Sequence, residues 1–375
     1  MTSEEKLEVT QLLKQLINIE STNPPGNENK IANFIKNYLS ENKIPAELVY
    51  LAENRSSIVG RIDGTSKRNI ALCGHIDTVR VNKNKWSKPP FKGIIENGKM
   101  YGRGASDMKG GIAAILYAAI LLKRRNIIPD KTIVLALTAD EEQKYSGAKK
   151  LLERGYFDET EFLIIAEPTD SKVYIGEKGE LWIKAIFHGK AAHGSTPELG
   201  NNAIIAGSKF VLHVQELSDK TFTEHSYFGK TSLNVGQFSG GIQVNIVPDY
   251  SEIMLDFRVI SQENKEKAVA LVNIAGRKAA DETNIKFESE IFSYHPPIFS
   301  DPSNFFVNKF IQKTQIEQRG IIGYCTDGAT IIPKKQIPFV IYGPGAIALA
   351  HQPDEYITLN SLYEAVDNFA AFLMK

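Results

Sequence analysis

The segment "LTADEEQ", residues 137–143, closes an apolar run and places three acids side by side: Asp140, Glu141 and Glu142. Like charges at such short range repel one another, and the repulsion grows where the dielectric constant is low. A bound divalent cation would reverse the sign of this interaction and make the cluster favourable. The alternative is that all three acids face solvent after the strand.

A histidine and an aspartate stand two residues apart in "CGHIDTV", residues 73–79. His75 and Asp77 close a predicted strand, and side chains two residues apart point to the same side of a strand. Open α/β sheets bind ligands at the carboxyl ends of their strands. An imidazole beside a carboxylate suits a metal ligand with the partner that orients it. The alternative is a satisfied polar pair at a strand end.

Three further candidates each have a plain structural alternative. Asp107 in "YGRGASDMKGG" stands between a glycine-rich turn and a helix start, where Asp also serves as an N-cap. A nucleotide-binding loop is a weaker alternative for this segment, because the Walker ending is missing. Glu167 in "LIIAEPT" ends a buried strand, where a lone glutamate is usually solvated. His351 in "GPGAIALAHQPDE" lies beside glycines that permit close backbone approach, or it is a surface histidine.

These candidates share one kind of place, the carboxyl end of a strand or the loop after it, and together they offer neutral imidazoles and several carboxylates. Such a donor set suits Zn²⁺, Co²⁺ or Mn²⁺.

Composition excludes several classes of protein. The 375 residues carry 44 basic and 44 acidic side chains, so no basic face for nucleic acid is expected. No apolar run is long enough to span a membrane, and "MTSEEKLEVTQLLKQL" reads as a charged amphipathic helix rather than a signal peptide. Two cysteines, Cys73 and Cys325, make no disulfide framework. We therefore expect a cytoplasmic protein.

Most of the chain alternates helices with buried strands. Helices are predicted near 4–20, 28–42, 108–125 and 145–155, and strands at "AELVYL", "SSIVGRI", "NIALCGH", "KTIVLALTA" and "EFLIIAE". The same style returns after about residue 294, with a helix, "PFVIYG" and a last helix from Ser361. This alternation predicts an α/β domain with a mostly parallel sheet and helices on both faces.

The middle of the chain has a different pattern. "GELWIKAIFHG", "TSLNVGQFSGG" and "SEIMLDFRVI" alternate apolar and polar residues, and helices are predicted near 202–217 and 264–281. Such alternation is typical of a half-exposed antiparallel sheet. We predict a discontinuous catalytic domain, residues 1–178 and 293–375, interrupted by an α+β domain of residues 179–292.

The motifs in their order resemble one known family over almost the whole chain. "STNPPGNE", "CGHIDTV", "GRGASDMKGG", "TADEEQ", "AEPT", "AAHGSTPELGNNA", "NIVPD…LDFRV" and "HQPDE" are similar to the M20 metallopeptidases. That family includes acetylornithine deacetylase, succinyl-diaminopimelate desuccinylase, aminoacylases and carboxypeptidases. The motifs resemble most the deacylases of the first two types.

The resemblance implies two divalent metal ions per chain, Zn²⁺ first, with Co²⁺ or Mn²⁺ as alternatives. It assigns His75 and Glu167 to one metal, Glu142 and His351 to the other, and Asp107 as the bridge. It makes Asp77 the residue that orients His75 and Glu141 the general base that acts on water, while Asp140 supports the site. A cis peptide bond is implied at Asp107–Met108.

The inserted domain resembles the family's lid and dimerisation domain, so the implied assembly is a homodimer. His193 matches a histidine that reaches the neighbouring subunit's site and stabilises the oxyanion. Asn245 and Arg258 match positions that contact substrate, and a guanidinium grips a carboxylate with two bonds, although Arg258 is equally a surface strand charge. "GYCTDGATI" resembles the substrate loop and assigns Thr326 to substrate binding.

The reaction implied is hydrolysis of the amide bond of an N-acyl amino acid, as in a deacylase of amino-acid biosynthesis. Desuccinylation is the leading specific hypothesis, although "GEKGE" places Glu180 where that branch tends to carry arginines, and Lys178 is the remaining cation. Two alternatives stay open: a dipeptidase or carboxypeptidase of the same family, and a metal- or peptide-binding module without turnover.

Overall fold

A computed structural model of the chain describes residues 1–316 and 319–374. It divides into two compact units, each with its own core. The first comprises Met1–Gly176, Phe299–Gly320 and Thr326–Lys375, and the second comprises Glu177–Ile298 and Ile321–Cys325. The insertion predicted at residues 179–292 falls inside the second unit, which continues to Ile298. The second unit also includes the short segment Ile321–Cys325, which lies along the chain between two segments of the first unit.

The main sheet has the order β1-β2-β6-β3-β7-β15-β8-β13, with β14 beside β8. Its four central strands run parallel to one another, β2 runs antiparallel to both of its neighbours, β1 and β6, and β8 runs antiparallel to β15. The bounds are β1 Ala46–Ala52, β2 Arg55–Ile62, β3 Ser66–His75, β6 Lys131–Thr138, β7 Thr160–Ile165, β8 Val173–Glu177, β13 Ile298–Phe299, β14 Arg319–Ile322 and β15 Phe339–Ile341.

The register of the parallel strands brings their carboxyl ends to one edge. His75 at the end of β3 is paired with Thr138 at the end of β6, and Cys73 is paired with Ile165 at the end of β7. The loops that follow these strands therefore all start at the same edge of the sheet. Residues 70–73 of β3, 133–137 of β6 and 162–165 of β7 are apolar and buried, because both faces of the sheet are covered.

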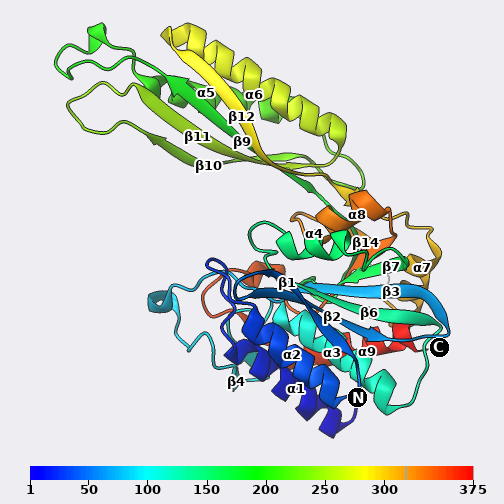
Figure 1. The fold of residues 1–375 in the computed structure, drawn as a ribbon. Helices are drawn as coiled ribbons and strands as arrows, with labels where there is room; N and C mark the ends of the chain where they lie inside the picture. Colours follow the sequence, from blue (N-terminus) through cyan, green and yellow to red (C-terminus); the bar gives the residue numbers. More distant parts are fainter. Residues whose placement is uncertain (317–318, 375) are drawn as a thin grey trace. The chain divides into compact units, whose positions relative to one another are not determined.

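Helices cover both faces of this sheet, as expected (Figure 1). On one face lie α1 Ser3–Asn18, α2 Asn29–Glu41, α3 Lys109–Arg124 and α9 Leu359–Leu373, and on the other lie α4 Ser146–Glu153 and α8 Gly328–Lys335. Helix α7, Phe305–Thr314, packs Phe310 against Phe372 of α9. A Cβ atom at Gly111 of α3 would lie 1.9 Å from the carbonyl oxygen of Ala166, so glycine allows α3 to touch the chain just before Glu167.

A small second sheet joins two loops that are distant in sequence. It consists of β4 Ile94–Glu96, β5 Lys99–Tyr101 and β16 Tyr356–Thr358, and Tyr101 is paired with Tyr356. The pairing holds the segment after β5, which carries Asp107, beside the segment before β16, which carries His351. Three-residue strands have too little periodicity to be recognised in a sequence.

The second unit is a four-stranded antiparallel sheet with two helices on one face (Figure 1). Its order is β10-β11-β9-β12, with β9 Gly179–His188, β10 Ser232–Gly240, β11 Tyr250–Val259 and β12 Lys286–His295. Helices α5 Ala203–Thr221 and α6 Gln262–Thr283 pack on it, and Phe187, Phe210 and Phe287 form an aromatic cluster in the core. The α+β pattern expected for the middle of the chain is thus the observed one.

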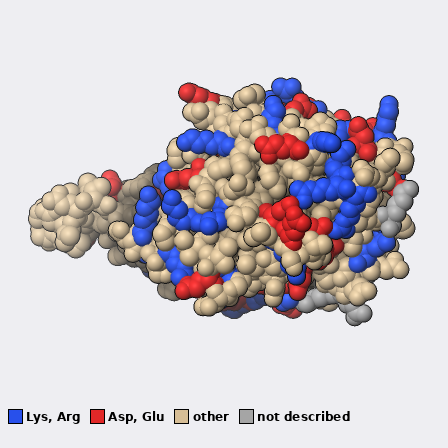
Figure 2. Space-filling view, turned by 90° about the horizontal axis from the view of Figure 1, so that it is seen from below, with Lys and Arg blue, Asp and Glu red and all other residues tan. Residues whose placement is uncertain are grey.

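Sequence patterns placed the long helices within a few residues of their observed ends, and α9 begins at Leu359 rather than Ser361. Short helical turns also occur: η1 Lys83–Lys85, η2 Pro197–Leu199 and η3 Ile347–Leu349. Basic and acidic side chains are interspersed on the face shown in Figure 2. Within the described part of the chain, no helix has both the length and the apolar character needed to cross a bilayer.

Candidate metal centre

His75 ends β3 and is almost completely buried, with 1% of its surface exposed. Its Nδ1 lies 3.0 Å from the backbone carbonyl of Asp77 and 3.7 Å from the Asp77 carboxylate. The nearer partner is a carbonyl, which only accepts, so Nδ1 carries the proton and donates it. In the neutral ring, Nε2 then presents its lone pair to the site, which is the tautomer that a metal ligand needs. Asp77 thus orients the ring chiefly through its backbone.

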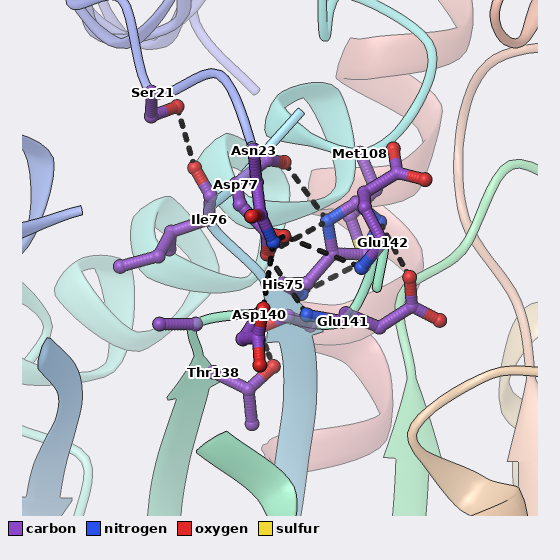
Figure 3. Close-up of polar contacts among 12 residues, drawn as sticks. Ser21, Asn23, His75, Ile76, Asp77, Met108, Thr138, Asp140, Glu141 and Glu142 are labelled. Atoms are coloured by element: carbon purple, nitrogen blue, oxygen red, sulfur yellow. Dashed lines mark hydrogen bonds and ion pairs between the residues drawn. The ribbon is translucent and has the colours of Figure 1, made fainter. Parts of the chain in front are cut away.

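The buried Asp77 carboxylate has a second task (Figure 3). It accepts hydrogen bonds from the backbone N–H groups of Glu141 and Glu142, both at 3.2 Å, and from Asn23 Nδ2 at 2.9 Å. Asp77, which contacts the His75 ring through its backbone carbonyl, therefore also holds the backbone of the acid pair. One carboxylate aligns the ends of two neighbouring strands.

Asp107 lies between two imidazoles. Its Oδ1 is 3.1 Å from His75 Nε2, and its Oδ2 is 3.3 Å from His351 Nε2. The Asp107–Met108 peptide bond is cis, as the resemblance implied. A carboxylate that presents one oxygen to each of two imidazoles has the arrangement of a bridging ligand.

The remaining predicted ligands surround these three residues. The Glu142 oxygens lie 3.1 and 3.3 Å from His351 Nε2. Glu141 and Glu167 each place an oxygen 3.9 Å from His75 Nε2. The structure thus brings together all five residues predicted as metal ligands. Glu141, which was predicted as the general base, lies close to them.

Asp140 turns away from this cluster. Its backbone is left-handed, with φ +68°, and its carboxylate contacts Asn23, Arg55 and Ser146. The three consecutive acids therefore point in different directions, and Asp140 is neutralised by Arg55 instead. The expectation that it supports the site from nearby agrees with this placement.

The pKa values of the cluster reflect burial and the neighbouring charges. Burial raises the pKa of Glu141 and that of Glu167 well above the usual range, although His75 opposes the rise. Burial of the His75 imidazole lowers its pKa, but the charges of Glu141, Glu167 and Asp107 outweigh burial and hold that pKa well above its usual range. Hydrogen bonds to Asp107 and Glu142 raise the pKa of His351 to about 10.

The donors fit a divalent transition metal. One ligand atom each from His75, Asp107 and Glu142 can be chosen so that all lie within 4.8 Å of one another. Imidazole nitrogens and carboxylate oxygens in one buried group are the ligands that Zn²⁺, Co²⁺ and Mn²⁺ accept. A dication would also relieve the repulsion that raises the carboxylate pKa values.

Glu355 is a residue whose role the sequence analysis missed. It is fully buried, and its carboxylate accepts hydrogen bonds from the backbone N–H groups of Gly104, Ser106 and Asp107 at 3.1, 2.8 and 2.9 Å. Arg103 Nη1 adds a charged contact at 2.6 Å. Glu355 therefore ties the loop of Asp107 to the segment that carries His351. "HQPDE" was the available signal, but nothing in it separates an anchor from a solvated glutamate.

The second unit places His193 and Asn245 side by side. Gly194 N–H donates to the Asn245 carbonyl at 2.8 Å, and both side chains are exposed. His193 Nδ1 accepts from Ser195 N–H at 3.2 Å and lies 2.7 Å from Ser195 Oγ. Its proton therefore resides on Nε2, which is free to donate.

Two predicted substrate contacts have local partners. Arg258 lies 3.0 Å from Asp256 and 3.5 Å from Glu180 within the second unit. Thr326 in the first unit is fully buried, and its hydroxyl accepts from Gly328 N–H at the start of α8. In this arrangement the Thr326 side chain supports the helix start.

The chain is similar to known proteins over most or nearly all of its length. The profile described as Peptidase family M20/M25/M40 matches residues 71–375. A probable succinyl-diaminopimelate desuccinylase of Staphylococcus aureus strain N315 is 31% identical, across 98% of this chain and 97% of the relative. Among solved structures, a tripeptidase from S. aureus has a TM-score of 0.83 at 22% identity, covering 98% of this chain and 97% of that one. An M20 metallo-carboxypeptidase from Sulfolobus solfataricus has a TM-score of 0.78 at 21% identity, covering 99% of each chain.

Fold and site together define a metal-dependent hydrolase whose candidate metal centre lies beside the carboxyl ends of the parallel strands. The chain belongs to peptidase family M20 and acts on amide bonds, as the order of its motifs indicated. The two solved structures share its fold.

The role of Glu355 can be tested by Glu355→Gln, which keeps the shape but removes the charge and turns an amide N–H₂ toward N–H donors. We expect unfolding free energy to fall by about 3–5 kcal/mol, the usual result of leaving a buried partner charge unpaired. Glu364→Gln on the exposed side of α9 is the control and should change stability by less than about 0.5 kcal/mol. Equal denaturation midpoints for the two variants would contradict the anchoring role.

Proposed function

We propose that the protein is a two-metal deacylase that removes an acyl group from an N-acyl amino acid. The observation that carries the reaction type is Asp107, whose two oxygens address two different imidazoles. The desuccinylase named among the relatives supports N-succinyl-L,L-diaminopimelate as the first substrate to test, since the similarity extends over nearly the full length of both chains. Such an enzyme would serve amino-acid biosynthesis in the cytoplasm, where the buried thiols of Cys73 and Cys325 would stay reduced.

His75 and Glu167 would hold one ion, Glu142 and His351 the other, and Asp107 both. Divalent ions, Zn²⁺ first and Co²⁺ or Mn²⁺ as alternatives, supply Lewis acidity that polarises a carbonyl and lowers the pKa of water. Glu141 is close to these residues and is not needed as a ligand. Its carboxylate takes a proton from the attacking water and passes it to the leaving amine. Asp77 keeps Glu141 and Glu142 in place through their backbone N–H groups.

His193 would stabilise the oxyanion with its Nε2–H, since Nδ1 is engaged by Ser195. We propose that this histidine acts in a neighbouring chain of a homodimer formed through the second unit. A C₂ contact would give each site one histidine from the partner. Asn245 lies beside His193 and would bind the same substrate.

A dipeptidase or carboxypeptidase of the same family is the second candidate, and a specific observation favours it. A succinyl group ends in a carboxylate that needs a free cation. Arg258 is already paired with Asp256 and Glu180, and Lys178 Nζ donates to the carbonyl of Lys230. A peptide substrate would make less demand on these cations. A binding module without turnover is the third candidate, although it has no use for Glu141.

The substrate is tested on Zn²⁺- and Co²⁺-loaded protein with N-succinyl-L,L-diaminopimelate, N-acetyl-L-ornithine, L-alanylglycine and a tripeptide. We expect the highest kcat/KM for the N-succinyl compound. A preference for the peptides would establish the second candidate. If no compound is hydrolysed although two ions are bound per chain, the binding module without turnover would be the remaining candidate.

The separate roles of the two glutamates predict different results on mutation. Glu141→Ala should retain two ions per chain by elemental analysis but lose about 10²–10⁴-fold in kcat, the usual contribution of a positioned general base. Glu142→Ala should lose affinity for one ion, like His351→Ala. Loss of metal from Glu141→Ala but not from Glu142→Ala would exchange the two roles.

Action in trans predicts complementation between two inactive variants. After subunit exchange, His193→Ala and Glu141→Ala chains should form hybrid dimers in which one site of two has both residues. Activity should approach roughly a quarter of wild type in an equimolar mixture, because half the dimers are hybrids. Absence of recovery despite proven exchange, or a monomer at working concentration, would argue against the shared site.

A further inference from the structure

The loop "STNPPGNE", residues 21–28, has no part in the chemistry described above, yet hydrogen bonds hold it close to the site. Asn23 N–H donates to the Thr78 carbonyl at 2.8 Å, and Thr78 N–H donates to the Ser21 carbonyl at 3.0 Å. Ser21 Oγ donates to the Ile76 carbonyl at 2.7 Å (Figure 3). The loop is therefore joined to the segment that carries Asp77.

The side chain of Asn23 links two carboxylates that would otherwise repel. Its Nδ2 donates to Asp77 Oδ2 and to Asp140 Oδ1, both at 2.9 Å (Figure 3). Carboxylates only accept, so the amide nitrogen must face them. Asn23 is 3% exposed, which makes these bonds strong and their loss costly.

Arg55, near the start of β2, completes the chain of contacts. Its Nη2 lies 3.0 Å from Asp140 Oδ1, and its Nε donates to Glu28 Oε2 at 3.0 Å while Nη2 also contacts Glu28 Oε1. Glu28 is fully buried and Asp140 nearly so. One guanidinium thus compensates two buried carboxylates with the fork geometry that arginine provides.

Gly26 makes room for this guanidinium. Its φ is +87°, and a Cβ atom there would lie 2.3 Å from Arg55 Nε and 2.4 Å from Arg55 Cζ. The loop passes over Arg55 only because residue 26 lacks a side chain. The loop's glycine, asparagine and glutamate therefore all serve the same group of contacts.

We propose that Arg55 is a positioning residue for the Glu141–Glu142 pair, acting through Asp140, Asn23 and Asp77. Each link is a direct contact: Arg55 to Asp140, Asp140 to Asn23, Asn23 to Asp77, and Asp77 to the two backbone N–H groups. The inference rests on the proposed roles of Glu141 as base and Glu142 as ligand.

Charge explains why the contacts depend on Arg55. Asp77 and Asp140 are buried acids joined through a single amide nitrogen, and Glu28 adds a third acid nearby. Without the guanidinium, Asp140 keeps its charge with only Asn23 and Ser146 as partners, and repulsion pushes it from Asp77. Asn23 would then keep its hydrogen bond to only one of these two acids. Asp77 would no longer be a fixed acceptor for the N–H groups of Glu141 and Glu142.

The test compares Arg55→Met with Arg61→Met. Arg61 is on the same strand, half exposed, and paired with Asp63. Hydrogen exchange of a peptide that contains the Glu141 and Glu142 amides is measured alongside the rest of the chain, and Co²⁺ affinity is measured by visible absorbance. In Arg55→Met we expect these amides to exchange at least about tenfold faster and Co²⁺ to bind about 10–100-fold more weakly. Arg61→Met should change neither.

A charge-matched variant separates positioning from bulk stability. Glu28→Gln with Arg55→Met and Asp140→Asn removes the two acids that the guanidinium serves, and it should recover most of the lost protection and Co²⁺ affinity. Unchanged exchange at residues 141–142 in Arg55→Met, or an increase spread evenly over the chain, would overturn the proposal, as would a triple variant no better than the single one. If Arg55→Met does not fold, Gly26→Ala, which displaces the guanidinium without altering any charge, must show the same local loss.

Neither measurement requires turnover, so two failures can be told apart. Local loss of protection in Arg55→Met, with no hydrolysis of the four substrates by wild type, would retain the positioning role and remove the proposed function. Hydrolysis by wild type with unchanged exchange at residues 141–142 would do the reverse.

Discussion

Buried carboxylates at the carboxyl end of the main sheet stay close together only while positive charge lies among them. Asp107, Glu141, Glu142 and Glu167 gather around His75 and His351, and burial raises the pKa of Glu141 and of Glu167 accordingly. A neutral core could not hold four acids in this way. The parallel strands, the loops that follow them and the capping contacts behind them all serve to bring these charges to one place.

Two anchors solve the problem of holding loops still. Asp77 fixes the ends of β3 and β6 together by accepting from the N–H groups of Glu141 and Glu142. Glu355 fixes the loop of Asp107 by accepting from three of its N–H groups, and the small sheet keeps Glu355 beside that loop. Both anchors are acids whose carboxylates accept hydrogen bonds from backbone N–H groups. Ligand geometry in this protein is thus set by backbone hydrogen bonds as much as by the ligand side chains.

The three consecutive acids of "LTADEEQ" lie in different environments because of this concentration of negative charge. Asp140 adopts a left-handed backbone and turns to Arg55, while the next two residues face the histidines. Glu141 and Glu142 also differ from each other, because Glu141 lies near His75 whereas Glu142 lies near His351.

The sequence by itself determined the α/β class, the long helices, the α+β character of the middle segment and the family. Apolar periodicity and the order of the motifs are local or linear properties, so they can be read before folding. The sequence also indicated which histidines and carboxylates would gather, because the ends of parallel strands meet at one edge. Asp107 was a candidate from its place between a glycine-rich turn and a helix start, but its position between two imidazoles appeared only in three dimensions.

Tertiary structure alone decided the rest. Glu355 and Arg55 lie far from their partners in sequence, and their importance comes from burial and from contacts with Asp107 and Asp140. Arg258, read from the sequence as a grip for a substrate carboxylate, lies near two acids of its own sheet, Asp256 on the same strand and Glu180 on the neighbouring strand. A single sequence reports what each residue offers. Which groups it meets, and whether its charge is already compensated, depends on distances that only the folded chain fixes.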